Sequence, residues 1–139
     1  MIERGIDPLK TEVYEEASVL IAGLISEFRR LVKKTELGLK ISRESPALIE
    51  LERAYFHDLL ELFFDRAVRE FGNLTDKVKP VALKNQLRND LVRNLKRPAS
   101  MIIIESDLCS TILMDEYSEL MGRFVADVER NASRPQVAA

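Results

Sequence analysis

The sequence contains few of the residues that mark a secreted, fibrous or membrane-spanning chain. Its 139 residues include five glycines, five prolines, one histidine and one cysteine. The single cysteine, Cys109, has no partner for an internal disulfide, which fits a reducing cytoplasm. So few glycines and prolines exclude collagen-like and low-complexity material. No apolar run approaches the roughly 18 residues of a membrane span, and no basic start leads into an apolar run, so we expect neither a membrane segment nor a secretory signal.

The sequence nevertheless contains enough hydrophobic residues to form a core. Hydrophobic residues make up 46% of the chain and charged residues 32%, at a length usual for one domain. This balance excludes a disordered chain, which has too few apolar residues to offset its ordering entropy. The net charge is −2, but residues 74–97 carry seven basic and two acidic side chains between two acidic segments.

Apolar residues recur at three- and four-residue steps in the first part of the chain. This spacing predicts a helix from about Pro8 to Lys34, with acidic residues near its start and basic residues near its end, as the helix dipole favours. Gly38 lies just past the expected end. A second helix is bounded by a capping Ser45, by Pro46 at the first helical position and by a terminating turn at Gly72. Its wide apolar face predicts the central helix of the fold.

Two further helices are expected in the second half. A narrow leucine stripe predicts a surface helix from near Pro80 that ends before Pro98. Residues 101–104 are all apolar and fit a buried strand or a helical turn; we favour helix because no second strand is available. A sustained apolar stripe follows from Leu108. The sequence therefore predicts a single all-α domain of four to five helices over residues 1–130, followed by a flexible tail at 131–139.

Residues for catalysis are scarce. Cys109 lies on an apolar stripe, where a buried thiol behaves as a small hydrophobic group. His57 lies on a charged strip, and Ala54 occupies the position where a helical di-metal site needs a glutamate. We therefore expect no enzyme activity, no metal site and no cofactor. A cleft that gathers His57 with several carboxylates would favour an enzyme instead.

The basic segment is the main candidate for binding. Its cations can neutralise phosphates, but the segment contains no aromatic residue on which a base would stack. Contact with nucleic acid, contact with an acidic protein and a solvated helix face all remain open. The candidate nucleic-acid-binding residues are Lys77, Lys79, Lys84, Arg88, Arg93, Lys96 and Arg97.

The stripe of the last helix allows a second kind of contact. It fills a bundle core or, alternatively, forms an interface with another subunit or a second copy of the chain. The candidate interface residues are Leu113, Tyr117, Leu120, Phe124 and Val128.

Short stretches at 13–17, 48–54, 59–66 and 73–75 resemble the helical domain of archaeal subunits of the replicative GINS complex. The second and third contain Leu-Ile-Glu-Leu-Glu-Arg-Ala and Leu-Leu-Glu-Leu-Phe, followed by Asp-Arg. The similarity covers about half the chain, and we expect no counterpart of the small β-rich domain usual in such subunits within these residues. The resemblance implies a non-catalytic scaffold that bridges a helicase and its partners.

The small helical subunit of CRISPR effector complexes is similar in size and class, and in such a complex the basic helix at 77–97 of this sequence would contact nucleic acid. The leading prediction is a cytoplasmic, non-enzymatic subunit of a multi-protein assembly that handles nucleic acid. The alternative from another class is a stand-alone adaptor bundle that binds an acidic protein.

Overall fold

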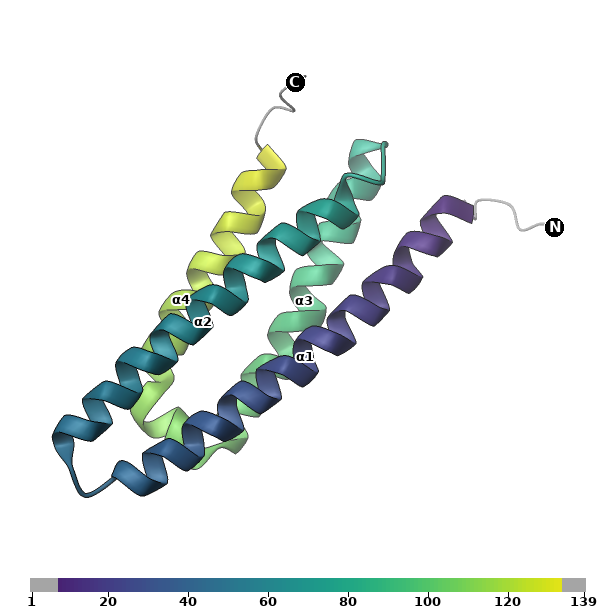
Figure 1. Cartoon of the computed structure of the whole chain (residues 1–139). Helices are drawn as coiled ribbons and strands as arrows, with labels where there is room; N and C mark the ends of the chain where they lie inside the picture. Colours follow the sequence, from purple (N-terminus) through teal and green to yellow (C-terminus); the bar gives the residue numbers. More distant parts are fainter. Residues whose placement is uncertain (1–7, 134–139) are drawn as a thin grey trace.

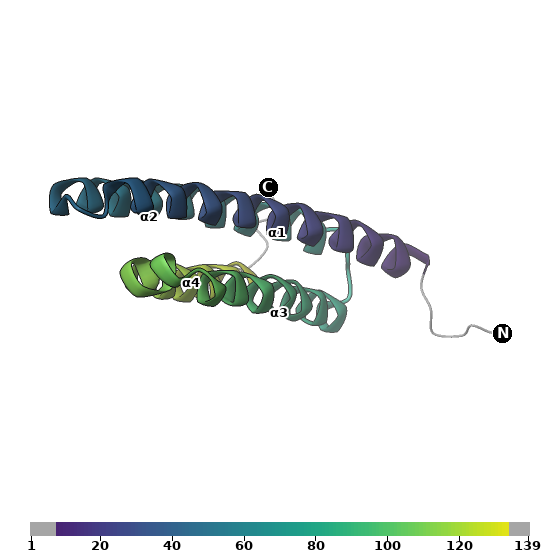
Figure 2. The same cartoon turned by 90° about the horizontal axis from the view of Figure 1, so that it is seen from below.

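Four antiparallel helices make up the computed structural model, which describes residues 8–133 (Figure 1). They are α1 (Pro8–Ser42), α2 (Pro46–Thr75), α3 (Val81–Glu105) and α4 (Asp107–Ser133). Helices α1 and α2 form one layer and α3 and α4 form the other (Figure 2). The prediction of a single all-α bundle is confirmed. Among the described residues, no helix combines the length and apolar character that a membrane crossing requires.

One core lies between the two layers and draws side chains from every helix. Aromatic rings dominate its centre: the Phe64 and Phe124 ring centroids are 5.1 Å apart, those of Phe71 and Phe124 are 5.7 Å apart and those of Phe28 and Phe63 are 5.4 Å apart. Tilted ring pairs of this kind add about 0.5–1.5 kcal/mol each beyond the area they bury. Because the pairs join α1 to α2 and α2 to α4, they stabilise contacts both within a layer and between layers.

Local capping determines the start of α2 as predicted. The Ser45 side chain accepts a hydrogen bond from the Leu48 amide at 3.4 Å, and Pro46 occupies the first helical position. The predicted end at Gly72 is wrong, because α2 continues to Thr75. Continuing the helix buries Leu74 in the core. The Gly72 carbonyl then accepts the Asp76 amide at 3.0 Å.

Helix α1 also extends further than predicted, to Ser42 rather than Lys34. The additional turns bury Leu39 completely, which favours a helical conformation there. Gly38 therefore lies inside the helix and not beyond it. A Cβ atom at this position would meet only the end of the Glu52 side chain of α2, which can move aside, so Gly38 marks a point where the two helices are in side-chain contact.

Pro98 does not end α3, and the predicted stop before it is wrong. The helix continues to Glu105, although the proline has no N–H to donate to the preceding turn, a cost of about 3 kcal/mol. The continuation buries Ala99, Ile102 and Ile103. Burial of an isoleucine stabilises by about 1.5–3 kcal/mol, so the two isoleucines offset the lost bond. The helical interpretation of residues 101–104 is confirmed.

A single residue, Ser106, separates the end of α3 from the start of α4, which continues to Ser133. The helical bundle therefore extends beyond the predicted boundary at residue 130. The rest of the predicted tail, residues 134–139, lies outside the described residues.

We expect Phe124→Ala to lower the free energy of unfolding by about 3–5 kcal/mol, because the ring is only 1% exposed and packs against two other rings. Urea denaturation followed by circular dichroism measures this. Met101→Ala is the control; its side chain is exposed, so the change should stay within about 0.5 kcal/mol. A Phe124→Ala protein of unchanged stability would contradict the placement of this ring in the core.

Candidate functional site

The structure pairs two of the seven predicted phosphate-binding cations with carboxylates. Lys77, in the connection between α2 and α3, places its Nζ 2.6 Å from Oε1 of Glu16 on α1. Arg93 places Nη2 2.6 Å from Oδ1 of Asp90, one turn earlier on α3. These two side chains are less available for phosphate than the sequence suggested.

Asp90 also links Arg93 to the rest of the fold. The Tyr14 hydroxyl on α1 donates a hydrogen bond to Oδ2 of Asp90 at 3.2 Å. Burial raises the pKa of Tyr14, and the hydrogen bond and the negative charge of Asp90 raise it further. The side-chain network from Tyr14 through Asp90 to Arg93 therefore connects α1 and α3. Arg93 thus takes part in the packing of these two helices.

Arg88 is half-buried and donates to Oδ1 of Asn85 at 2.9 Å. Burial lowers the pKa of its guanidinium, and the charge of Asp76 partly offsets this effect. The residue lies at a groove of about 280 Å³ between α3 and α4, which we call the α3–α4 groove. The lining residues of this groove are Arg88, Asn89, Val92, Arg93, Lys96, Val125, Val128 and Glu129.

The four other predicted cations form no ion pair within residues 8–133. Lys96 and Arg97 are adjacent and exposed on α3, Lys79 is exposed before α3, and Lys84 is half-buried. Thus the structure does not gather all seven cations in one patch. It brings Arg88, Arg93 and Lys96 to the α3–α4 groove, whose other lining residues include valines and one carboxylate and no aromatic ring.

The predicted interface on α4 is wrong, because all five of its residues lie in the core. The stripe faces the other helices of the same chain, so a partner has no access to it. These residues are Leu113, Tyr117, Leu120, Phe124 and Val128. The Tyr117 hydroxyl shares a 2.7 Å hydrogen bond with the Ser100 hydroxyl, and burial raises its pKa.

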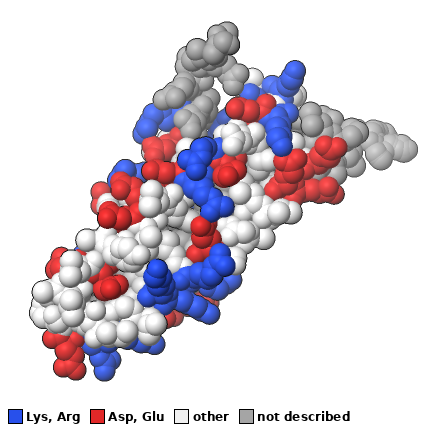
Figure 3. Space-filling model, viewed as in Figure 1, with Lys and Arg blue, Asp and Glu red and all other residues white. Residues whose placement is uncertain are grey.

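A different apolar surface is exposed, and the sequence analysis missed it. It lies on the outer side of α1 and α2, near their connection, where a large uncharged area is visible (Figure 3). The predicted central helix α2 therefore has a second apolar side that faces solvent: Leu51 is 64% exposed and Leu62 is 68% exposed. The width of the apolar face of α2 was the available signal, because one layer cannot cover all of it. We call this surface the outer apolar face; it consists of Leu37, Ile41, Leu48, Leu51, Tyr55 and Leu62.

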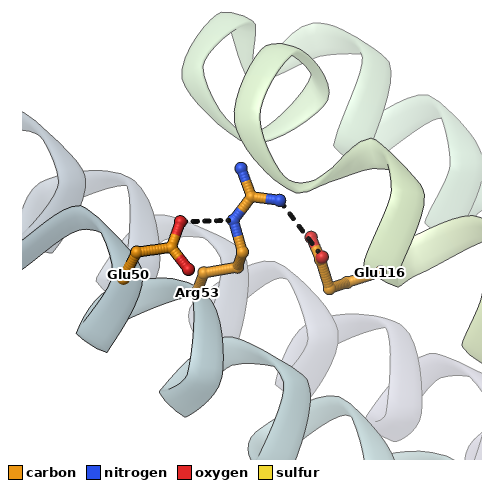
Figure 4. A network of polar contacts seen from close by, with 3 residues as sticks. All are labelled: Glu50, Arg53 and Glu116. Atoms are coloured by element: carbon orange, nitrogen blue, oxygen red, sulfur yellow. Dashed lines mark hydrogen bonds and ion pairs between the residues drawn. The ribbon is translucent and has the colours of Figure 1, made fainter. Parts of the chain in front are cut away.

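His57 lies at a shallow depression of about 300 Å³ with carboxylates from α2 and α4. Arg53 lies between two of them, with Nε 3.6 Å from Glu50 and Nη1 3.3 Å from Glu116 (Figure 4). The depression thus gathers the residue types that would favour an enzyme, together with Asp58. The shared arginine engages two of the carboxylates in a network that connects the two layers.

The described residues contain no group of three or more side chains suited to hold a metal ion. Glu116 has one carboxylate oxygen, Oε1, that is buried without a hydrogen-bond partner. Neither observation supplies a nucleophile or a substrate pocket. The expectation that the chain is not an enzyme stays a prediction.

No family model, curated protein or solved structure matches the chain. The similarity to GINS subunits therefore stays a prediction, based on the short stretches already described.

We expect Cys109 to react very slowly with a disulfide reagent such as DTNB in the native protein. Its side chain is 0% exposed, its thiol donates to the Val32 carbonyl at 3.8 Å, and burial raises its pKa, which disfavours the reactive thiolate. Release of thionitrobenzoate at mildly alkaline pH measures the rate. The same protein in urea is the control and should react completely within minutes. Equally fast reaction of the native protein would contradict the burial of this thiol.

Proposed function

We propose that the chain is a non-enzymatic helical subunit of a multi-protein assembly that handles nucleic acid, and that α3 contacts the phosphate backbone. The observation that carries this proposal is the adjacent pair Lys96 and Arg97, exposed and without an ion pair among the described residues. Lys96 also lies at the α3–α4 groove beside Arg88, so the positive charge continues from the outer side of α3 into the groove.

The chemistry of this surface favours phosphate over bases. Cations release counterions when they neutralise phosphates, and this term does not depend on sequence. Recognition of single-stranded bases needs aromatic side chains for stacking, and none lines the groove. The contact we propose therefore positions the subunit on a nucleic acid without selecting a sequence.

A GINS-like scaffold and a small subunit of a CRISPR effector complex require the same surface properties of a helical bundle. Each contacts proteins and a polyanion through its surface and needs no catalytic residue. Both remain open as the identity of the assembly.

The test is a titration of fluorescently labelled duplex DNA and RNA with the purified chain at about 50 mM salt, where phosphate contacts contribute most. If about four cations contact phosphate, the affinity should fall about 100-fold between 50 and 200 mM salt. Lys96→Glu with Arg97→Glu should remove about two contacts and lower the salt slope by about two.

Lys40→Glu with Arg43→Glu is the matched control, because these exposed cations near the α1–α2 connection give the same change in net charge at a site away from Lys96 and Arg97. Arg88 and Arg93 are poorer probes, since one is half-buried and the other is paired with Asp90. If both double variants lose affinity equally, the effect reflects overall charge and the assignment to α3 is wrong. If the wild-type chain binds neither nucleic acid, the proposal is wrong.

An acidic protein is the second candidate partner for α3. The specific observation in its favour is the presence of Val92 and Val125 at the α3–α4 groove between the cations. An amphipathic helix with acidic and apolar residues would match both features. A labelled acidic amphipathic peptide that binds in place of DNA, and loses affinity in Val125→Glu, would support this candidate.

A further inference from the structure

The layer of α1 and α2 is covered on one side only. Helices α3 and α4 pack on its inner side, and nothing in the described chain packs on its outer side (Figure 2). The core beneath is complete, with Phe28, Phe56 and Leu60 fully buried. Nevertheless the outer apolar face exposes six large apolar side chains to solvent. A contiguous surface of this kind on a small domain indicates an interaction site.

The charges around this face are divided between the two helices. On α1, three exposed cations lie within three turns of Leu37 and Ile41; they are Arg30, Lys33 and Lys34. On α2, the exposed residues that share a side with Leu51 and Leu62 include Asp58 and Asp65. Cations gather over the α1 side of the uncharged area (Figure 3). Around the apolar side chains the face is therefore basic along α1 and acidic along α2, and Arg69 follows two turns beyond Leu62.

Contacts between α1 and α2 show which residues of the two antiparallel helices lie at the same height along their common axis. We call this height the level of a residue. The Lys34 ammonium is 5.7 Å from the centroid of the Tyr55 ring. Further along, Gly38 faces Glu52. The levels of the two antiparallel helices are thus known from side-chain contacts.

Opposite charges and apolar residues recur at matching levels. Because each residue adds 1.5 Å along a helix, Asp58 of α2 lies about three residues beyond the level of Lys34, between the levels of Lys33 and Arg30. Nearer the connection, Ile41 of α1 lies about at the level of Leu48 of α2. Each half of the face is therefore the complement of the other half.

We propose that the outer apolar face binds the same face of a second copy of the chain, about a two-fold axis parallel to α1 and α2. This axis places α1 of each copy on α2 of the other at the same level. Leu37 and Ile41 then pack on Leu48 and Leu51 of the second copy, and Lys33 faces Asp58. A two-fold axis across the helices would instead place α1 on α1 and bring like charges together.

The division of charge also explains why the partner is a second copy. A two-fold interface requires a surface that is complementary to itself, and here basic levels of one helix match acidic levels of the other. The inference goes beyond the proposed function, because it assigns a partner to a surface of the other layer and does not involve α3.

The first experiment measures the mass of the full chain in solution by sedimentation equilibrium over a wide range of protein concentration. We expect a monomer–dimer equilibrium. Leu51→Glu should raise the dimer dissociation constant at least about tenfold, because it places a charge at the centre of an apolar contact. Ile104→Glu is the matched control: this residue is 56% exposed on α3, and the substitution should leave the equilibrium unchanged. Circular dichroism shows that both variants are folded.

The second experiment tests the arrangement of the two copies. Arg30→Glu with Lys33→Glu should weaken the dimer about tenfold, because it places negative charges on both sides of the level of Asp58, and Asp58→Lys should weaken it in the same direction. The variant that combines all three substitutions reverses both sides and should restore most of the affinity. These substitutions lie at exposed positions, so the fold is retained.

Two results would overturn the proposal. One is a monomer at every concentration, which would mean that the outer apolar face serves another partner. The other is a dimer that Leu51→Glu does not weaken, or whose affinity the combined Arg30, Lys33 and Asp58 variant does not restore. Loss of DNA binding in the Lys96 and Arg97 variant leaves this inference intact, and the intrinsic DNA affinity of each subunit should not change in Leu51→Glu, so the two proposals fail separately.

Discussion

The packing of the Phe124 ring against Phe64 and Phe71 is the contact on which the rest of the structure depends. It joins α4 to α2 across the two layers, and Phe28 extends the same cluster into α1. Rings from these three helices fill the centre, whereas α3 contributes a narrow stripe of leucines before Pro98, including Leu91, and buries Ala99, Ile102 and Ile103 beyond it. A helix with a narrow apolar stripe has more of its circumference available for charge. The aromatic core therefore makes it possible for α3 to carry the cations of the proposed function.

Helix α2, in contrast to α3, has two apolar sides. Its phenylalanines face the core, whereas leucines such as Leu51 and Leu62 face away from it. In the monomer, this outward apolar side lowers the solubility of the protein and makes no packing contacts. Its presence therefore points to a contact with another molecule. The charge pattern supplies one, since Lys33 and Asp58 lie at similar levels on neighbouring helices. Binding by a second copy and binding by nucleic acid would then use opposite layers of the same bundle.

The sequence predicted the features that depend on local physics and missed those that depend on packing. The start of α2 is determined by Ser45 and its neighbour within one turn, so it was predictable. The passage of α3 through Pro98 depends on distant partners that bury Ile103, and local rules gave the wrong end. The same limit applies to the candidate site. The pairing of Lys77 with Glu16 joins residues far apart in the sequence, and an apolar stripe does not reveal whether it faces the core or a partner.

An even number of antiparallel helices brings the beginning of α1 and the end of α4 to the same end of the bundle (Figure 1). The connection between α1 and α2, with the outer apolar face beside it, lies at the opposite end. Anything tethered to either end of the chain, whether another subunit or a reporter, is thus about one helix length from that face. In a pair of copies related by an axis along the helices, all four tethers would leave in the same direction. Two cargoes would then be held side by side, with a spacing set by the thickness of the bundles and not by the length of a linker.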